Sequence, residues 1–471
     1  MKKLIVIILV FLIAVGFFTP ALQAEESAFS TSDASSTSDS AFSTSSFGSA
    51  ENEKELSWGG TLELDTRAIL DKNGQSDIYS DPSLDLDLNY KKNNSEFEAT
   101  LNFDEGAEDE VAIEEAFMRL YYENYDLVVG KKKEVWGKGD KLHVVDNLNG
   151  EDLTDFVNPE YLERQIGEEM VKMNYYLGAG TLEAVYTPNF TPDRLATNGN
   201  WVTSGIEEIN SLEPNLISEF GAVGASKVQD SLDNNSQQEI EDGQIGLRYT
   251  NSKSGYDYGF SFYQGYLKRP SLNKVAINKL QKGLYTDYQS FLTDLDWHYD
   301  EVSVFGTELS AVIGEVNSRA ELAYYLTDDT EGNNAEVHNN KIAWLIGGDR
   351  DLPFHNLNLN LQVKSEYILD HEKIEENGRL DIEYNQDDEY LTNLLSLEVS
   401  DEFKNQTVLP STTLVYNLES DDYYWNNELE LKLKDDTSLI MSYKLFEGDQ
   451  GTEFGQFDEN DYLSAVFKYD F

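Results

Sequence analysis

Residues 84–90 read Leu-Asp-Leu-Asp-Leu-Asn-Tyr, with an apolar side chain at every second position and a polar one between. Successive side chains of a β-strand point to opposite faces, so this pattern places all the apolar residues on one face. A helix would scatter the same residues around its circumference. The stretch therefore predicts a strand with one apolar face and one acidic face.

The same alternation continues along the chain in both directions. It runs through residues 58–70 and 95–103 on either side of the first stretch, and it returns late in the chain at 356–366 and 423–434. Segments of this length with period two are typical of half-buried strands, and none of them has helical spacing. We therefore predict an all-β fold from residue 56 to residue 471.

Nineteen segments of the sequence fit the strand pattern, whereas bacterial membrane barrels normally have an even number of strands. We predict eighteen strands, with sixteen as the fallback, and 379–385 is an extra strand candidate. The nineteen segments are 58–70, 82–90, 95–103, 112–122, 125–132, 168–177, 180–188, 243–251, 255–265, 291–299, 302–313, 318–327, 339–348, 356–366, 391–400, 407–418, 423–434, 437–446 and 460–471.

A soluble β-sandwich also alternates, so three further features decide between the two folds. The polar face is charged along whole strands, as expected where it lines water and the other face meets lipid. Tyr and Trp gather near segment ends, as at Tyr121, Tyr122 and Trp425, which is typical of interfacial aromatic girdles. The chain ends on an amphipathic strand with Phe471, which resembles the signal that barrel-assembly machinery recognises. These features predict a transmembrane antiparallel up-and-down β-barrel.

The N-terminal part of the chain has a different composition. Met1, Lys2 and Lys3 precede an apolar run of about fifteen residues, shorter than the roughly twenty of a spanning helix, and Ala24 follows. We predict a signal peptide over residues 1–24, export to the bacterial outer membrane, and a disordered Ser/Thr-rich segment over 25–55. The chain has no cysteine, so neither a disulfide nor a lipidated cysteine can anchor it.

The formal net charge of −53 excludes nucleic acid as a reasonable partner. Two interpretations of this acidity remain open: an acidic lumen that favours cations, or adaptation of the whole surface to a saline habitat. The connections between strands are short at Asn124, at Gly180 and at Asp435, and long over 133–167, 189–242 and 266–290. Short turns at one end and long loops at the other are the barrel pattern. We expect the loop 189–242 to fold into the lumen as a constriction.

The most distinctive motif runs from Gly130 to Asp140 and contains Trp136 followed by Gly137. It resembles a motif of substrate-channel barrels related to alginate-export porins and their uncharacterised relatives, and the resemblance covers about residues 112–195. Those families carry an Arg after an Ala-aromatic pair on the preceding strand, which here implies Arg119. The relatives often have Gln where this sequence has Lys132.

We expect charged residues of the first strands and of this motif to line the pore. Lys131, Lys133, Lys138, Arg119 and Arg164 beside Glu115, Asp140 and Asp146 would form the transverse field of a constriction; a solvated rim is the alternative. The pore-lining prediction comprises Glu63, Asp65, Arg67, Asp85, Asp87, Glu96, Glu98, Glu115, Arg119, Lys131, Lys133, Asp140, Asp146 and Arg164.

No catalytic or metal-binding residue is predicted. The five histidines fall in no hydrolase or metalloprotease frame, and we expect them to be solvated loop residues. Acidic runs such as 328–333 do not match the EF-hand frame. We therefore expect neither an enzyme nor a cofactor.

The predicted function is a porin-like outer-membrane channel for passive diffusion of small hydrophilic solutes, with a preference for cations and with membrane lipid as its surroundings. Two alternatives stay open: a barrel-anchored adhesin or structural surface protein, and a secreted soluble β-rich protein that binds carbohydrate.

Overall fold

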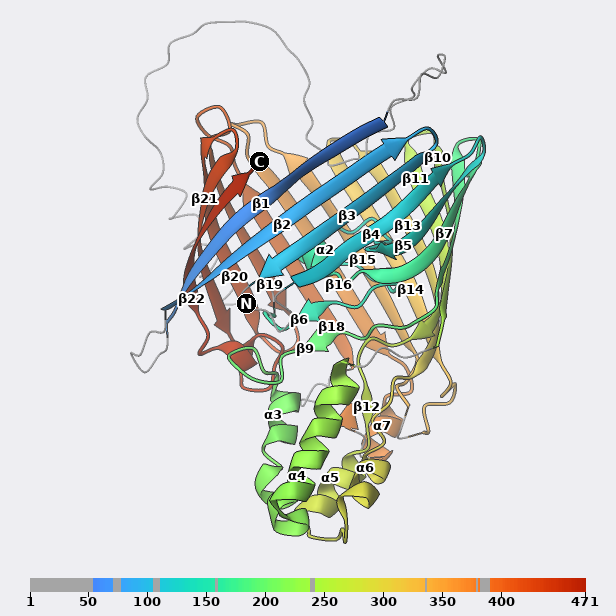
Figure 1. Cartoon of the computed structure of the whole chain (residues 1–471), viewed down its shortest axis with the longest axis vertical. Helices are drawn as coiled ribbons and strands as arrows, with labels where there is room; N and C mark the ends of the chain where they lie inside the picture. The colour runs from blue at the N-terminus through green and yellow to red at the C-terminus, as the bar shows by residue number, and fades with distance from the viewer. Residues whose placement is uncertain are drawn as a thin grey trace, which may run out of the picture. The chain divides into compact units, whose positions relative to one another are not determined.

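The computed structural model describes residues 54–70, 78–104, 111–156, 160–237, 242–334, 337–377, 380–381 and 390–471. Eighteen antiparallel strands form one closed ring, in which each strand pairs with the next along the chain and the last pairs with the first (Figure 1). The strands are β1 (Lys54–Ile69), β2 (Ile78–Lys92), β3 (Ser95–Asp104), β4 (Val111–Tyr121), β5 (Tyr125–Lys132), β7 (Glu168–Leu177), β8 (Gly180–Thr187), β10 (Gln244–Lys253), β11 (Tyr256–Tyr266), β13 (Glu301–Ile313), β14 (Val316–Thr327), β15 (Lys341–Asp351), β16 (Asn358–Ile368), β18 (Leu391–Ser400), β19 (Val408–Asn417), β20 (Tyr423–Lys434), β21 (Thr437–Glu447) and β22 (Tyr462–Asp470).

The prediction of an eighteen-stranded barrel is confirmed, and one of the nineteen segments was wrong. Residues 291–299 belong largely to helix α6 (Tyr288–Leu295), whose buried Phe291 and Leu295 are four residues apart. Asp287 caps the helix by accepting a hydrogen bond from the backbone N–H of Ser290 at 2.9 Å. In the extra segment 379–385, β17 (Leu380–Asp381) pairs with β12 (Ser271–Leu272) apart from the ring, and the other residues lie outside the described part.

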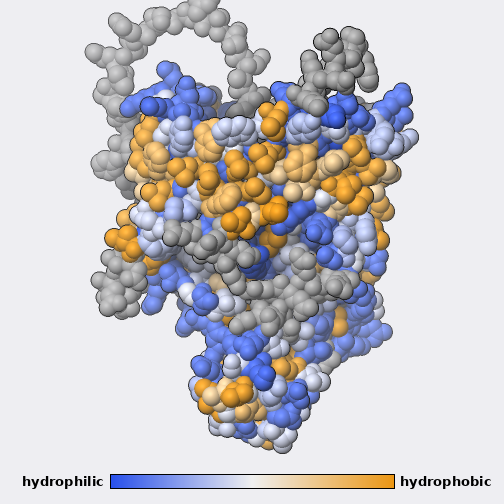
Figure 2. All heavy atoms as spheres, in the orientation of Figure 1, coloured by the Kyte–Doolittle hydropathy of each residue, from blue (hydrophilic) through white to orange (hydrophobic). Residues whose placement is uncertain are grey.

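The period-two pattern decides which side chains face outward. Leu62 and Leu64 of β1 are 46% and 43% exposed, while the intervening Glu63 turns to the inner side and contacts Lys468. The exposed apolar residues form a band over the strands, with hydrophilic residues at both of its edges (Figure 2). No helix in the described ranges is long and apolar enough to cross a membrane.

The two ends of the barrel differ in the length of their connections. At one end the strands join through tight turns, as at Asn93–Asn94 between β2 and β3 and at Asp435–Asp436 between β20 and β21. At the other end β5 and β7 are separated by 133–167, and β8 and β10 by 188–243. The predicted contrast between short turns and long loops is therefore present.

The long connections carry short elements of their own. Helices α3 (Ser204–Asn210), α4 (Glu213–Gln237), α5 (Lys274–Gln281) and α6 share one apolar cluster at the long-loop end of the barrel (Figure 1). We call these four helices the helical cap. Smaller elements are β6 (Asp152–Leu153), β9 (Arg194–Leu195), α2 (Tyr161–Arg164), α7 (Glu372–Asn377) and the 3-10 helix η1 (Gly455–Phe457).

The prediction that 189–242 is a constriction loop was wrong for most of the segment. Most of its described residues lie in α3 and α4, with Leu216 and Val228 buried against the other helices of the cap. The apolar pair Leu212 and Leu216 and the pair Val228 and Leu232 each have the i, i+4 spacing of a helix. Pro214 and the Asn and Gly residues between them favoured a loop in the sequence, although proline is tolerated in the first turn of a helix.

Candidate functional site

The connection between β5 and β7 folds against the inner wall of the barrel; we call residues 133–167 the lumen loop. Trp136, Val144, Val145 and Leu148 of this loop are almost fully buried. They form one apolar cluster with inward residues of β7, β8, β11, β13, β14 and β15, among them Met170, Val185, Tyr263, Val304, Ala323 and Leu345. The lumen loop therefore narrows the barrel on this side. The start of 189–242 packs on another part of the wall, where Ala196 and Trp201 share a cluster with Leu394 and Tyr462.

Two glycines of the wall make room for this packing. A Cβ atom at Gly246 of β10 would lie 2.7 Å from the Trp136 ring, and one at Gly306 of β13 would lie 2.9 Å from Val145. Any side chain at these inward positions would push the lumen loop toward the barrel axis. The Trp-Gly motif thus packs onto a surface prepared by glycines on distant strands.

Paired charges lie beneath the same part of the loop. Lys172 of β7 binds both Glu134 of the loop and Glu183 of β8. Arg248 of β10 continues the row, because it contacts Glu183 at 3.3 Å and Glu308 of β13 at 2.6 Å. Opposite charges in contact compensate each other, which buried ions require. The wall under the lumen loop therefore offers little unpaired charge to a solute.

The far part of the lumen loop is tied across the barrel. Lys141 pairs with Glu398 of β18 at 2.9 Å, and Asp155 pairs with Arg67 of β1 at 2.7 Å. The Arg67 guanidinium also lies 5.4 Å from the centre of the Tyr462 ring, within cation–π distance. The loop therefore reaches strands well beyond the two that it connects.

Asp146 of the lumen loop is a buried acid. It accepts hydrogen bonds from the Tyr161 hydroxyl at 2.7 Å and from the Trp136 backbone N–H at 3.2 Å. Burial raises the pKa of Asp146 to about 6, in spite of these bonds and of nearby His143. Asp146 therefore holds the loop together instead of presenting charge to the lumen.

The inner wall of β1–β4 is different, because an open groove of about 320 Å³ lies along it. Its inward lining includes Asp87, Glu98, Thr100 and Glu115. Asp87 accepts a hydrogen bond from Thr100 at 2.7 Å. With respect to the described residues, neither Asp87 nor Glu98 has a cation within ion-pair distance. Glu115 pairs with Lys132 at 3.9 Å, so the unpaired negative charge of the groove belongs to Asp87 and Glu98.

The predicted pore-lining residues divide into three groups by position. The inner faces of β1–β4 carry Glu63, Asp65, Arg67, Asp85, Asp87, Glu96, Glu98, Glu115 and Arg119, as the strand pairing shows. The lumen loop carries Lys133, Asp140, Asp146 and Arg164. Lys131 does not join either group, because it shares the outer face of β5 with the exposed Val129 and donates to the Ile113 carbonyl.

The expected transverse field of lysines beside acids is only partly assembled. Lys133 pairs with Glu114 at 2.8 Å, and its backbone N–H donates to Glu115. Arg164 pairs with Glu151 at 2.8 Å within the loop. Residues that the sequence reasoning missed hold the loop instead: Lys172, Glu183, Arg248, Glu308 and Glu321. Their signal was available, because each is a charged residue at an inward position of an alternating strand.

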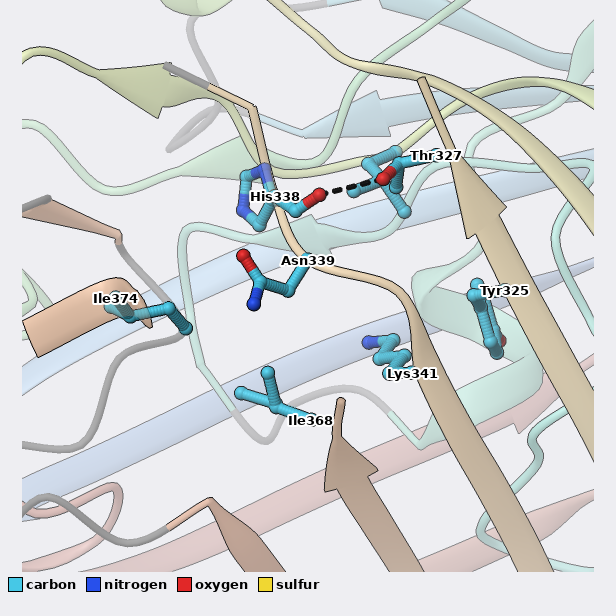
Figure 3. A pocket seen from close by; sticks show the side chains of 8 residues that line it. Tyr325, Thr327, His338, Asn339, Lys341, Ile368 and Ile374 are labelled. Atoms are coloured by element: carbon cyan, nitrogen blue, oxygen red, sulfur yellow. Dashed lines mark hydrogen bonds between the residues drawn. The ribbon is translucent and has the colours of Figure 1, made fainter. Parts of the chain in front are cut away.

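The expectation of solvated histidines was wrong for two of them. The side chains of His143 and His338 are only 6% and 5% exposed. His338 lines a small cavity of about 20 Å³ together with Tyr325, Thr327 and Lys341 (Figure 3). This space admits about one water molecule and no larger solute.

His338 also contacts a serine and an aspartate, but not in a catalytic arrangement. Ser271 Oγ and an Asp300 oxygen both meet the same ring nitrogen, Nδ1. A nucleophile relay requires serine and aspartate on opposite nitrogens of the ring. No cluster of potential metal ligands occurs among the residues that the structure describes.

No protein-family model matches the sequence, and no curated protein matches it. Several solved porin structures are similar over most of both chains. OccK11 (OpdR) of Pseudomonas aeruginosa matches with a TM-score of 0.46 and 8% identity, covering 88% of this chain and 95% of its own. A mutant of the Rh. blastica porin matches with 0.39 and 12%, covering 88% and 100%. OmpF of Salmonella typhi, in a complex with daunomycin, matches with 0.40 and 8%, covering 88% and 97%. At such identities the likeness concerns the barrel fold.

Proposed function

We propose that this protein is an outer-membrane, porin-like channel through which small hydrophilic solutes diffuse passively, with a preference for cations. The observation that carries the proposal is the unequal inner wall. Under the lumen loop the charges are paired and buried, whereas the groove along β1–β4 presents Asp87 and Glu98 without a paired cation. A solute moving past the loop would meet the acidic side.

The inner side of the barrel is polar and accessible to solvent. Lys364 and Glu366 of β16 form an ion pair at 2.9 Å deep in the ring, yet their side chains stay 25% and 28% exposed. The outer face, by contrast, exposes residues such as Phe260, Leu322 and Ile346. An apolar exterior around a polar interior is the arrangement of a membrane channel. It also argues against the soluble carbohydrate-binding protein.

The acidic excess on the inner faces of β1–β4 supports the cation preference. The acidic residues there include Glu63, Asp65, Asp85, Asp87, Glu96, Glu98 and Glu115, and the basic ones include Arg67, Lys91 and Arg119. Lys91 pairs with Glu96 at 2.8 Å. Negative charge in a narrow polar passage raises the local concentration of cations. Salt weakens this effect because the screening length falls to about 3 Å at 1 M.

The test is the reversal potential of the refolded protein in planar bilayers under a KCl gradient. We expect discrete conductance steps and a cation-selective potential, reduced in the double variant Asp87→Asn/Glu98→Gln. Asp435→Asn, in a tight turn outside the groove, serves as the matched control and should leave selectivity unchanged. An anion-selective potential at low salt would refute the preference, and a silent inserted barrel would refute the channel.

Anchorage of a surface domain is the second candidate function. The observation in its favour is the helical cap, which has its own apolar cluster around Leu280, Phe291 and Val228. A barrel that inserts normally but never conducts would favour this function.

The route to the membrane completes the proposal. The C-terminal strand closes the ring: the Phe471 N–H donates to the Gly60 carbonyl at 3.0 Å, and the Phe471 ring lies 5.9 Å from that of Trp58. We infer that this strand, with outward Leu463 and Phe467, is what the barrel-assembly machinery recognises after export by the signal peptide. The channel needs no cofactor, and its resemblance to alginate-export-type porins over 112–195 stays a prediction.

A further inference from the structure

The lumen loop closes around one carboxylate of the barrel wall. Glu321 projects inward from β14, and its side chain is fully buried. One oxygen, Oε1, accepts hydrogen bonds from the backbone N–H groups of Lys138 at 2.5 Å and Gly139 at 2.6 Å. The other, Oε2, accepts one from the N–H of Val144 at 2.8 Å. Three main-chain donors of the loop therefore converge on a single side chain about 180 residues away.

The loop backbone is shaped for this carboxylate. Gly137 has φ = +118°, and a Cβ atom there would lie 2.4 Å from Glu321 Oε1. At Gly139 a Cβ would lie 1.9 Å from the Leu142 carbonyl oxygen. Consecutive N–H groups that point into one concavity form an anion-binding nest. The two glycines of the Trp-Gly-Lys-Gly motif thus allow the loop to wrap around an anion that the wall supplies.

Glu321 is also placed on a rigid support. The strand β14 pairs along its length with β13 and β15, and Glu321 lies opposite Glu308 on one side and Leu345 on the other. His143 Nδ1 lies 3.5 Å from Oε1, which adds a fourth neighbour from the loop. A carboxylate held in this way restricts residues 137–144 to one position, since its charge cannot leave the nest without new partners.

We propose that Glu321 is the positioning residue of the lumen loop, and that its carboxylate sets a single width for the channel. This inference rests on the proposed channel function, because the width is read as conductance. Without the carboxylate the three N–H groups lose their acceptor, and residues 137–144 gain freedom to move into the passage. The emptied nest would then take up a small carboxylate from solution in place of the side chain.

Glu321→Ala tests the proposal, because it removes the carboxylate and leaves space of similar shape. In planar bilayers with a constant KCl background, we expect the single conductance level of the parent to be lost and replaced by fluctuating levels. Added sodium formate should restore the single level in this variant and leave the parent unchanged. A merely structural role of Glu321 would give no rescue by formate.

Glu315→Ala is the matched control, since Glu315 lies in the turn before the same strand, is exposed, and pairs only with Arg350 among the described residues. It should keep the parental level with and without formate. If Glu321→Ala does not insert, Glu321→Gln keeps the volume, and we expect fluctuating levels that formate does not correct. A stable parental level in either inserted Glu321 variant would overturn the proposal.

A second measurement separates this inference from the channel function. The chain has no cysteine, so Lys138→Cys provides a single label in the loop. We expect a thiol reagent to modify it faster in the Glu321→Ala background, and formate to slow that reaction. An unchanged rate would refute the positioning role, whereas a silent parent would refute the channel and leave this result valid.

Discussion

His298 shows how a single residue can make the rim of the barrel sensitive to pH. Its Nε2 lies 3.0 Å from Asp300 Oδ1, and its Nδ1 lies 2.7 Å from the carbonyl oxygen of Asp296. Both ring nitrogens face acceptors, so the imidazolium form satisfies both contacts. The hydrogen bond that His298 donates to Asp300 is the main reason that the pKa of His298 rises to about 9.

Rim stability should therefore fall as pH rises. A raised folded-state pKa means that the contribution of His298 is complete below its unfolded value near 6.5 and is lost as pH passes about 9. Because the side chain is about one-third exposed, we expect only about 1–2 kcal/mol after screening. Hydrogen exchange of residues 271–300 should accelerate between pH 6.5 and 9 after correction for intrinsic rates. His298→Ala should remove the acceleration that remains after this correction. Equal dependence of the exchange rate on pH in the two proteins would contradict the prediction.

Gly246 carries a second prediction at the same scale. In Gly246→Ala the new Cβ would lie 2.7 Å from the Trp136 ring, so the ring must shift, and we expect a loss of about 1–3 kcal/mol. This loss of unfolding free energy is measured by urea titration, with the heat-dependent gel mobility of the barrel as the readout of the folded fraction. Gly205→Ala in α3 meets no atom within 4 Å and should be neutral or slightly stabilising. Equal urea concentrations at the midpoint of unfolding for the two variants would show that the lumen loop does not depend on this contact.

At the scale of elements, the strands were predictable because each one carries its own evidence. The alternation of Leu84, Leu86 and Leu88 with acids reports on one strand and both of its faces, without knowledge of its neighbours. A closed ring of eighteen strands was predictable because every strand of a membrane barrel must form backbone hydrogen bonds on both of its edges. Helix α6 was mistaken for a strand because Phe291, Leu292 and Leu295 form too short a run for the two periods to be distinguished.

The lumen loop was only half predictable for a different physical reason. The Gly130–Asp140 motif identified part of the lumen loop in the sequence. The alternation of side chains along β1–β3 identified the acidic residues that face inward. The partners of the loop could not be identified in this way, because Gly246, Gly306 and Glu321 meet it only after the ring has closed around residues far apart in sequence. Lys131 was misplaced because a cluster of lysines at a strand end does not reveal which of them points outward.

At the scale of the whole molecule, the barrel and the helical cap bury different apolar clusters, although Leu153 of the lumen loop packs against the cap cluster. The cap cluster contains Ile277 and Leu280 of α5 and Leu216 of α4, whereas the cluster inside the barrel is built around Trp136. The strands that flank the α3–α4 insertion pair directly, with Thr187 of β8 opposite Gln244 of β10. The ring of hydrogen bonds is therefore complete without the helices.

This separation predicts that the barrel folds without its cap. Replacing residues 204–237 and 274–295 by short Gly/Ser linkers removes all four helices and leaves every strand pair of the ring intact. We expect the variant to keep the gel-mobility shift of a folded barrel and to conduct at least as well as the parent, since the lumen loop and its wall contacts remain. A linker exchange at Asp435–Asp436 alone controls for loop replacement. A variant that refolds but no longer conducts would mean that the cap shapes the channel mouth, because barrel closure and lumen loop would both still be present.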